Sequence, residues 1–172
     1  IHTAEPVKDG TKNAESLFRI LSPRVGQIRA DKKFPVILGG EHTISSGCVA
    51  SFDTDMSVLQ LDAHADLREE YQGTRWNHAC VMKRITDAGY HTVGVGLRSL
   101  TAGERRLIQF QNWPRWFAHQ LNGNWIEHVI ASLKERVYIT LDVDVLDSGI
   151  MPATGTPEPG GMNWLQVTTL LS

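Results

Sequence analysis

The chain has 172 residues, of which 41% are hydrophobic and 21% are charged, as expected for one folded globular domain rather than a disordered or fibrous protein. With 17 basic and 19 acidic residues the net charge is −2, which argues against a nucleic-acid partner, and no apolar run reaches the roughly 18 residues of a membrane span. The two cysteines, Cys48 and Cys80, are too few for a disulfide scaffold and no signal peptide is visible, so we expect a cytoplasmic protein.

Apolar residues on one side of a helical repeat predict a helix from Asn13 to Ile20, and Pro23 should end or kink it. Short apolar runs downstream predict buried strands at 34–38, 57–61, 92–97 and 137–141. The segments between the strands have helical spacing, which predicts helices over 43–52, 78–88, 101–110 and 125–134. Strands that alternate with helices predict an α/β fold whose mainly parallel sheet is covered on both faces. The segment 149–161, rich in glycine and proline, is predicted to be a long functional or disordered loop.

Potential metal ligands follow three of the predicted strands. The candidates are His42, Asp62, His64, Asp66, Asp142 and Asp144. The first follows the strand at 34–38, the next three alternate directly after 57–61, and the last two alternate after 137–141. Residues two apart on an extended chain point to the same side, about 6.5–7 Å apart. Because the carboxyl ends of parallel strands meet at one edge of a sheet, we expect these side chains to converge.

Divalent ions would stabilise such a cluster, since four aspartates gathered without cations repel one another and are costly to bury. Six ligands exceed what one ion usually takes, and carboxylates can bridge two ions about 3.5–4 Å apart. Oxygen ligands with some imidazole and no thiolate favour Mn²⁺ over a structural zinc. A single Asp after a strand is more often a cap or turn residue, so the metal hypothesis depends on the motifs converging.

These motifs resemble those of the ureohydrolase family, the arginases and agmatinases. The matching segments, within about residues 34–170, are Gly39-Gly-Glu-His-Thr43, Leu61-Asp-Ala-His-Ala-Asp66, and Thr140-Leu-Asp-Val-Asp-Val-Leu-Asp147 with its continuation to Gly161. The resemblance implies a single domain over 1–172 with the three-layer α/β/α, arginase/deacetylase-like fold, and a trimeric or hexameric homo-oligomer. It also implies two Mn²⁺ ions per chain, with Asp62 and Asp142 bridging them. One ion would take His42, Asp62, Asp66 and Asp142, and the other Asp62, His64, Asp142 and Asp144.

The resemblance further implies hydrolysis of a small guanidino substrate, agmatine to putrescine and urea, by a metal-bridging hydroxide that attacks the guanidinium carbon. Asp66 could accept a hydrogen bond from that hydroxide and orient it. His78 matches the family's proton-shuttling histidine and would protonate the departing amine. Without the resemblance, a solvated histidine at a helix start is the simpler interpretation. Arg68 stands where arginases carry asparagine, and this, with the segment 156–161, is similar to the agmatinase branch.

The chain departs from the family pattern in ways that leave other functions open. Family members are longer at both ends, and the strand that carries their guanidinium-binding glutamate is not in this sequence. The alternatives are a catalytically impaired metal-binding subunit, or a guanidinobutyrase- or formiminoglutamase-type hydrolase. A deacetylase-like amide hydrolase with one zinc is a third, but it would not use both carboxylate motifs fully. Arg98, after the strand at 92–97, either lines the site or forms a structural ion pair.

Overall fold

A computed structural model describes residues 2–7 and 14–172 of the chain. Its centre is a sheet of strands in the order β3-β2-β1-β4, and all neighbouring pairs are parallel. The strands are β1 (Ser57–Leu61), β2 (His91–Leu97), β3 (Arg115–Phe117) and β4 (Val137–Leu141). The strands predicted at 57–61, 92–97 and 137–141 are confirmed, whereas the short β3 has no signal in the sequence pattern.

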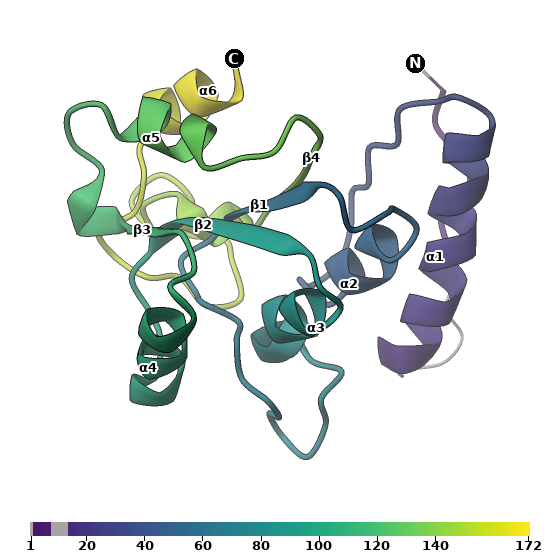
Figure 1. Cartoon of the computed structure of the whole chain (residues 1–172), viewed down its shortest axis with the longest axis horizontal. Helices are drawn as coiled ribbons and strands as arrows, with labels where there is room; N and C mark the ends of the chain where they lie inside the picture. The colour runs from purple at the N-terminus through teal and green to yellow at the C-terminus, as the bar shows by residue number, and fades with distance from the viewer. Residues whose placement is uncertain (1, 8–13) are drawn as a thin grey trace.

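Helices cover both faces of this sheet (Figure 1). On one side lie α2 (Ile44–Val49), α3 (Val81–Asp87) and α4 (Ala102–Gln111), and on the other α5 (Trp125–Ala131) and α6 (Trp164–Leu171). Successive side chains of β1 point to opposite faces. Val58 therefore packs with residues of α2, α3 and α4, whereas Leu59 and Leu61 pack with residues of α5 and α6. The predicted three-layer α/β/α arrangement is confirmed.

Helix boundaries differ from the prediction by a few residues. The helix expected over 43–52 is the shorter α2, and the one over 78–88 divides into a 3-10 helix (His78–Cys80) and α3. Further 3-10 helices occupy Ala118–Gln120 and Val143–Val145. Among the described residues, no helix is both long enough and apolar enough to span a bilayer.

The predicted end of the first helix is wrong. α1 (Ala14–Ala30) continues through Pro23, and the predicted first residue, Asn13, lies outside the described residues. Proline removes one helical hydrogen bond and usually ends or kinks a helix. Here Leu21 and Val25, on either side of the proline, are both buried against Cys48 of α2. Packing on α2 therefore stabilises the helix on both sides of the proline.

The predicted strand at 34–38 is also wrong. The segment has no regular structure, and Phe34, Val36 and Leu38 are 89%, 74% and 92% exposed. β4 is an edge strand whose only partner among the described residues is β1. A groove of about 620 Å³, lined by both segments, lies between 34–38 and β4. An apolar run forms a strand only where a neighbouring backbone accepts its hydrogen bonds, and 34–38 faces a groove instead.

Candidate metal centre

Asp62 and His64 follow β1 directly and are held by hydrogen bonds within the same turn. Asp62 is 1% exposed, and its Oδ1 accepts the backbone N–H of His64 at 2.7 Å. Gln60 Nε2 donates to Asp62 Oδ2 at 2.9 Å and to the carbonyl of His64 at 3.0 Å. Asp66 has a left-handed backbone, with φ of 53°, and its carbonyl accepts hydrogen bonds from the first turn of α3. Aspartate is among the few residues that tolerate this conformation. These hydrogen bonds hold the side chains of the motif after β1 in position.

A 3-10 helix (Val143–Val145) follows the carboxyl end of β4; Asp142 caps it and Asp144 lies within it. The N–H of Asp142 donates to the carbonyl of Leu61 at 2.9 Å, so the ends of β1 and β4 are tied together. Asp142 Oδ1 accepts the N–H of Asp144 at 3.2 Å, and Asp144 Oδ1 accepts the N–H of Ala63 at 3.0 Å. The second motif is thereby fixed against the first.

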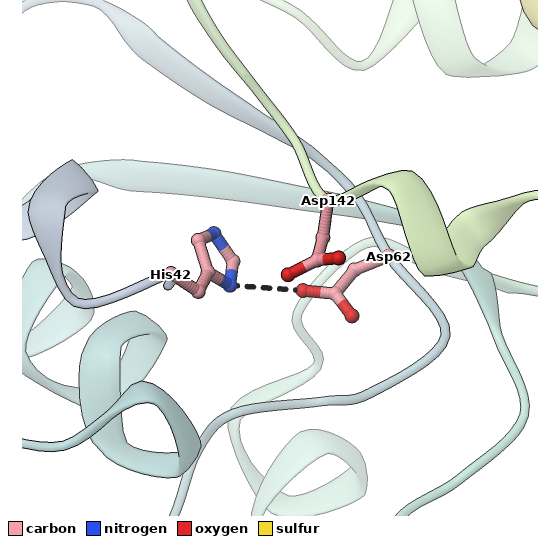
Figure 2. A group of neighbouring side chains, drawn as sticks. All are labelled: His42, Asp62 and Asp142. Carbon is pink, nitrogen blue, oxygen red and sulfur yellow. Dashed lines mark ion pairs between the residues drawn. The ribbon is translucent and has the colours of Figure 1, made fainter. Parts of the chain in front are cut away.

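His42 reaches the centre from the segment that precedes α2, and it is 7% exposed. Its Nδ1 lies 3.0 Å from Asp62 Oδ2 and 2.8 Å from Asp66 Oδ2. Its Nε2 is 2.9 Å from Thr140 Oγ1, which also contacts Ser45 Oγ at 2.7 Å. Thr140 and Ser45 thus orient the ring so that Nδ1 points at the carboxylates, as Figure 2 shows for Asp62.

The six predicted ligands lie together at the carboxyl edge of the sheet. Two triads among them have ligand atoms within 4.8 Å of one another: one is His42, Asp62 and Asp142 (Figure 2), and the other is Asp62, His64 and Asp144. We call these the His42 group and the His64 group. In the His64 group, Nδ1 of the imidazole lies 3.0 Å from Asp144 Oδ2. Asp66 joins the His42 group through its contact with the imidazole, and Asp62 belongs to both groups.

The carboxyl groups of this centre repel one another. Burial and the charge of Asp62 raise the pKa of Asp66 to about 7, and burial with the charge of Asp62 raises the pKa of Asp142. Burial also opposes ionisation of Asp62, but hydrogen bonds from His42 and His64 outweigh it and lower the pKa of that carboxyl. Asp62 therefore stays ionised more readily than Asp66 and Asp142, and it lies where the two groups meet.

The imidazoles respond to the same negative field. Burial opposes protonation of His42, but hydrogen bonds with Asp62 and Asp66 raise its pKa well above the usual range. Contacts with Asp144 and Asp62 raise the pKa of His64 to about 10. A metal ion binds the neutral imidazole and the ionised carboxylate, so a divalent cation in either group would replace a ring proton. The oxygen-rich donor set, with one imidazole in each group and no thiolate, fits two such cations.

His78 lies at the rim of the centre and belongs to neither group. Its Nδ1 is 3.2 Å from Glu41 Oε2, and its side chain is 45% exposed. Glu41 precedes His42 in the chain and also accepts a hydrogen bond from Thr43 Oγ1 at 2.7 Å. An imidazole that contacts both solvent and the border of the site suits proton transfer between them.

Several residues that shape the centre are absent from the sequence prediction. Gln60 and Thr140 orient ligands, and both are polar residues inside apolar strands, which is a signal the sequence does contain. Glu158 Oε1 lies 3.7 Å from His64 Nε2, and Thr156 Oγ1 donates to Asp144 Oδ2 at 3.4 Å. Both come from the predicted 149–161 loop, whose length and resemblance to the agmatinase branch at 156–161 hint at a role without identifying these contacts.

Comparison with known proteins agrees with this geometry. The model described as Arginase family matches residues 1–172. The chain belongs to the arginase family. N(1)-aminopropylagmatine ureohydrolase of Synechocystis sp. is 36% identical over 177 residues, covering 96% of this chain and 58% of that protein. Agmatinase of Pyrococcus horikoshii is 36% identical over 162 residues, covering 91% of this chain and 56% of that protein.

A solved structure supports the same assignment. Agmatine ureohydrolase of Thermoplasma volcanium matches this arginase-family chain with a TM-score of 0.87 and 32% sequence identity, covering 95% of this chain and 58% of that one. The predicted family and fold class are confirmed. The chain spans less than two thirds of the length of these relatives.

Proposed function

We propose that this arginase-family chain is a binuclear, Mn²⁺-dependent hydrolase that releases urea from a guanidino compound, and that agmatine is the leading candidate substrate. The position of Asp62 carries the proposal. This carboxylate is shared by the His42 and His64 groups, is almost fully buried, and is held by fixed donors on both oxygens. Such a carboxylate suits the bridging of two cations.

The bound ions would lower the pKa of a shared water and so supply hydroxide near neutral pH. The chain's own residues would do the rest. Asp66, beside His42, is placed to accept a hydrogen bond from the attacking water and orient it. Glu41 holds Nδ1 of His78, which leaves Nε2 to protonate the departing amine as urea and putrescine form.

Several finer features belong to the proposal. Mn²⁺ at two ions per chain follows from the oxygen-rich donor set and the family. The six ligands would divide as the family pattern implies, with Asp142 as the second bridge. A homo-oligomer and a cytoplasmic location are expected as well, the latter because the cysteines are free and buried, which suits a reducing compartment.

A second substrate follows from the names of the relatives. Proteins named N(1)-aminopropylagmatine ureohydrolase match this chain at 36% identity, as the agmatinase of Pyrococcus horikoshii does. Both names describe a guanidino group on an amine chain, so both substrates present the same reacting carbon. Guanidinobutyrate and formiminoglutamate are further candidates, and a metal-binding subunit without turnover is the non-enzymatic alternative.

The test measures bound Mn²⁺ per chain and urea release from agmatine, N(1)-aminopropylagmatine, guanidinobutyrate and arginine, with ammonium and formamide followed for formiminoglutamate. We expect two ions per chain and urea from one of the first two substrates. Asp62→Asn should abolish both signals. The exposed Asp55, which pairs with Arg136 at the surface, provides the matched control, and Asp55→Asn should retain them. Two bound ions without turnover would favour the metal-binding subunit, and a single ion would contradict the binuclear site.

A further inference from the structure

Arg98 lies directly after β2 and beside the candidate metal centre, and its guanidinium donates hydrogen bonds only to backbone carbonyls among the described residues. The carbonyls that accept its hydrogen bonds belong to Gly96, Asp144, Val145, Leu146, Glu158 and Pro159. The shortest contacts, at 2.6 and 2.8 Å, join Nη2 to Asp144 and Glu158. Among the described residues, no carboxylate forms an ion pair with Arg98. The structural ion pair that the sequence left open for Arg98 is therefore not formed by these residues.

The carbonyls at the end of the 3-10 helix Val143–Val145 need donors from outside it, because the last carbonyls of a helix have no partner within it. Val145 already accepts the N–H of Met162 at 2.9 Å, whereas the carbonyls of Asp144 and Leu146 accept from Arg98. Arg98 joins them to the 158–159 segment of the long loop. A Cβ on Gly161 would lie 2.6 Å from Arg98 Nη2, so only glycine lets the loop close over the side chain.

The backbone of Arg98 also holds the segment that carries Asp62 and His64. Its N–H donates to the carbonyl of Ala63 at 2.8 Å, and the N–H of Ser99 donates to that same carbonyl at 2.9 Å. Ala63 stands between Asp62 and His64. Besides Asp62, the His64 ring contacts Asp144 and Glu158, and the segments that carry these two residues are held by one guanidinium.

We propose that Arg98 is a positioning residue for the His64 group, because it fixes Asp144 and Glu158 around His64. Its effect on the His42 group is much smaller, because it reaches that group only through the N–H of Asp144 that Asp142 Oδ1 accepts. This rests on the proposed function, in which the two groups each hold an ion. The residues that orient His42, namely Thr140 and Ser45, have no contact with Arg98. Loss of the guanidinium should therefore weaken one ion site and spare the other.

Arg98→Lys tests this, since lysine keeps the charge but cannot reach six carbonyls with one planar group. The matched control is Arg115→Lys. Arg115 is another buried arginine that donates to carbonyls, those of Thr92 and Pro114, near the start of β2 and away from the ligands. Mn²⁺ binding is followed by calorimetry, and the exchange-coupled signal of an ion pair by electron paramagnetic resonance.

For Arg98→Lys we expect one of two Mn²⁺ sites to weaken by about 10- to 100-fold, the size typical of outer-shell changes, while the other changes less than about two-fold. The coupled signal should disappear, and Arg115→Lys should retain both sites. Equal weakening of both sites, or of neither, would overturn the proposal. If Arg98→Lys does not fold, Arg98→Gln, whose amide keeps fewer donors toward the same carbonyls, must give the selective loss. Failure of both variants to fold would make Arg98 a folding residue and also overturn it.

Calorimetry of Mn²⁺ binding to the wild-type chain, together with the urea assay, shows whether the role of Arg98 or the proposed hydrolysis has failed. Two ions without urea release would refute the proposed hydrolysis and leave the role of Arg98 to be decided by the variants. An absence of Mn²⁺ binding by the wild-type chain would refute both.

Discussion

Replacing Asp66 by asparagine should stabilise the metal-free protein while abolishing the proposed hydrolysis. Burial and the charge of Asp62 raise the pKa of Asp66 to about 7, so the folded protein resists ionisation of this side chain. An asparagine side chain would have no charge to bury, and asparagine also tolerates the left-handed backbone at this position, where φ is 53°. Its amide oxygen can still accept a hydrogen bond from His42 Nδ1, which lies 2.8 Å from the present carboxylate.

The size of the effect follows from the pKa of Asp66. A rise from 3.8 to about 7 corresponds to about 4 kcal/mol, at about 1.4 kcal/mol per pH unit. In the unfolded chain the carboxyl loses its proton near pH 3.8, and in the folded chain only near pH 7. Between these values the unfolded state binds fewer protons, so stability falls as pH rises through this window. The asparagine variant has no carboxyl group at this position, so its stability does not fall for this reason as pH rises. Because the charge of Asp66 also favours protonated His42, we expect a net gain of about 2–4 kcal/mol at pH 8.

The assay is unfolding by guanidinium chloride in the presence of a chelator, followed by tryptophan fluorescence. Asp66→Asn should be more stable than the wild-type chain at pH 8, and the difference should fall by about half at pH 5. Asp55→Asn, at an exposed side chain, should change stability by less than about 0.5 kcal/mol at either pH. A variant that is less stable than wild type at pH 8, or a difference that does not change with pH, would refute the reasoning.

Further substitutions test the site and its support. Asp144→Asn should remove one of two Mn²⁺ ions and Asp62→Asn both, as measured by metal analysis, because only Asp62 belongs to both groups. His78→Ala should leave the metal content intact and lower kcat by about 10²- to 10⁴-fold, since it removes only a proton donor; equal loss of metal would contradict that role. Gly96→Ala should lower the free energy of unfolding by at least about 2 kcal/mol, because φ is +90° and a Cβ would lie 2.6 Å from Val145 Cγ2. Gly155→Ala, with no atom within 4 Å of the added Cβ, is its control in the same unfolding measurement.

The convergence of the candidate ligands after β1 and β4 could be predicted because the geometry within each motif is local, whereas His42 follows no strand. Asp62, His64 and Asp66 alternate after an apolar strand, and Asp142 and Asp144 do the same. Spacing along one strand end then fixes which side chains point together, whatever the rest of the chain does. Only the parallel order of β1 and β4 was needed to join the two motifs, and the alternation of strands and helices predicts parallel pairing.

The failed predictions depended on distant partners. The local chemistry of Pro23 predicts that it ends or kinks the helix, but the helix does not end there, because burial of Leu21 and Val25 against Cys48 stabilises it beyond the proline. The run at 34–38 has the composition of a strand, yet a strand requires hydrogen bonds from a neighbour, and this segment faces a groove. In both cases the deciding contacts come from residues that no short sequence window contains.

Arg98 shows the same limit at the site itself. Its position after β2 is visible in the sequence, but the carbonyls it binds are up to 61 residues away, on two segments that meet only in the folded chain. A carbonyl carries no signature of its own, since every residue has one. Sequence motifs therefore identify the atoms that could touch an ion, whereas the group that sets their positions is found only from coordinates. If Arg98→Lys weakens one ion site selectively, the Mn²⁺ affinity of that site depends on a residue that is not itself a ligand and that no ligand motif would reveal.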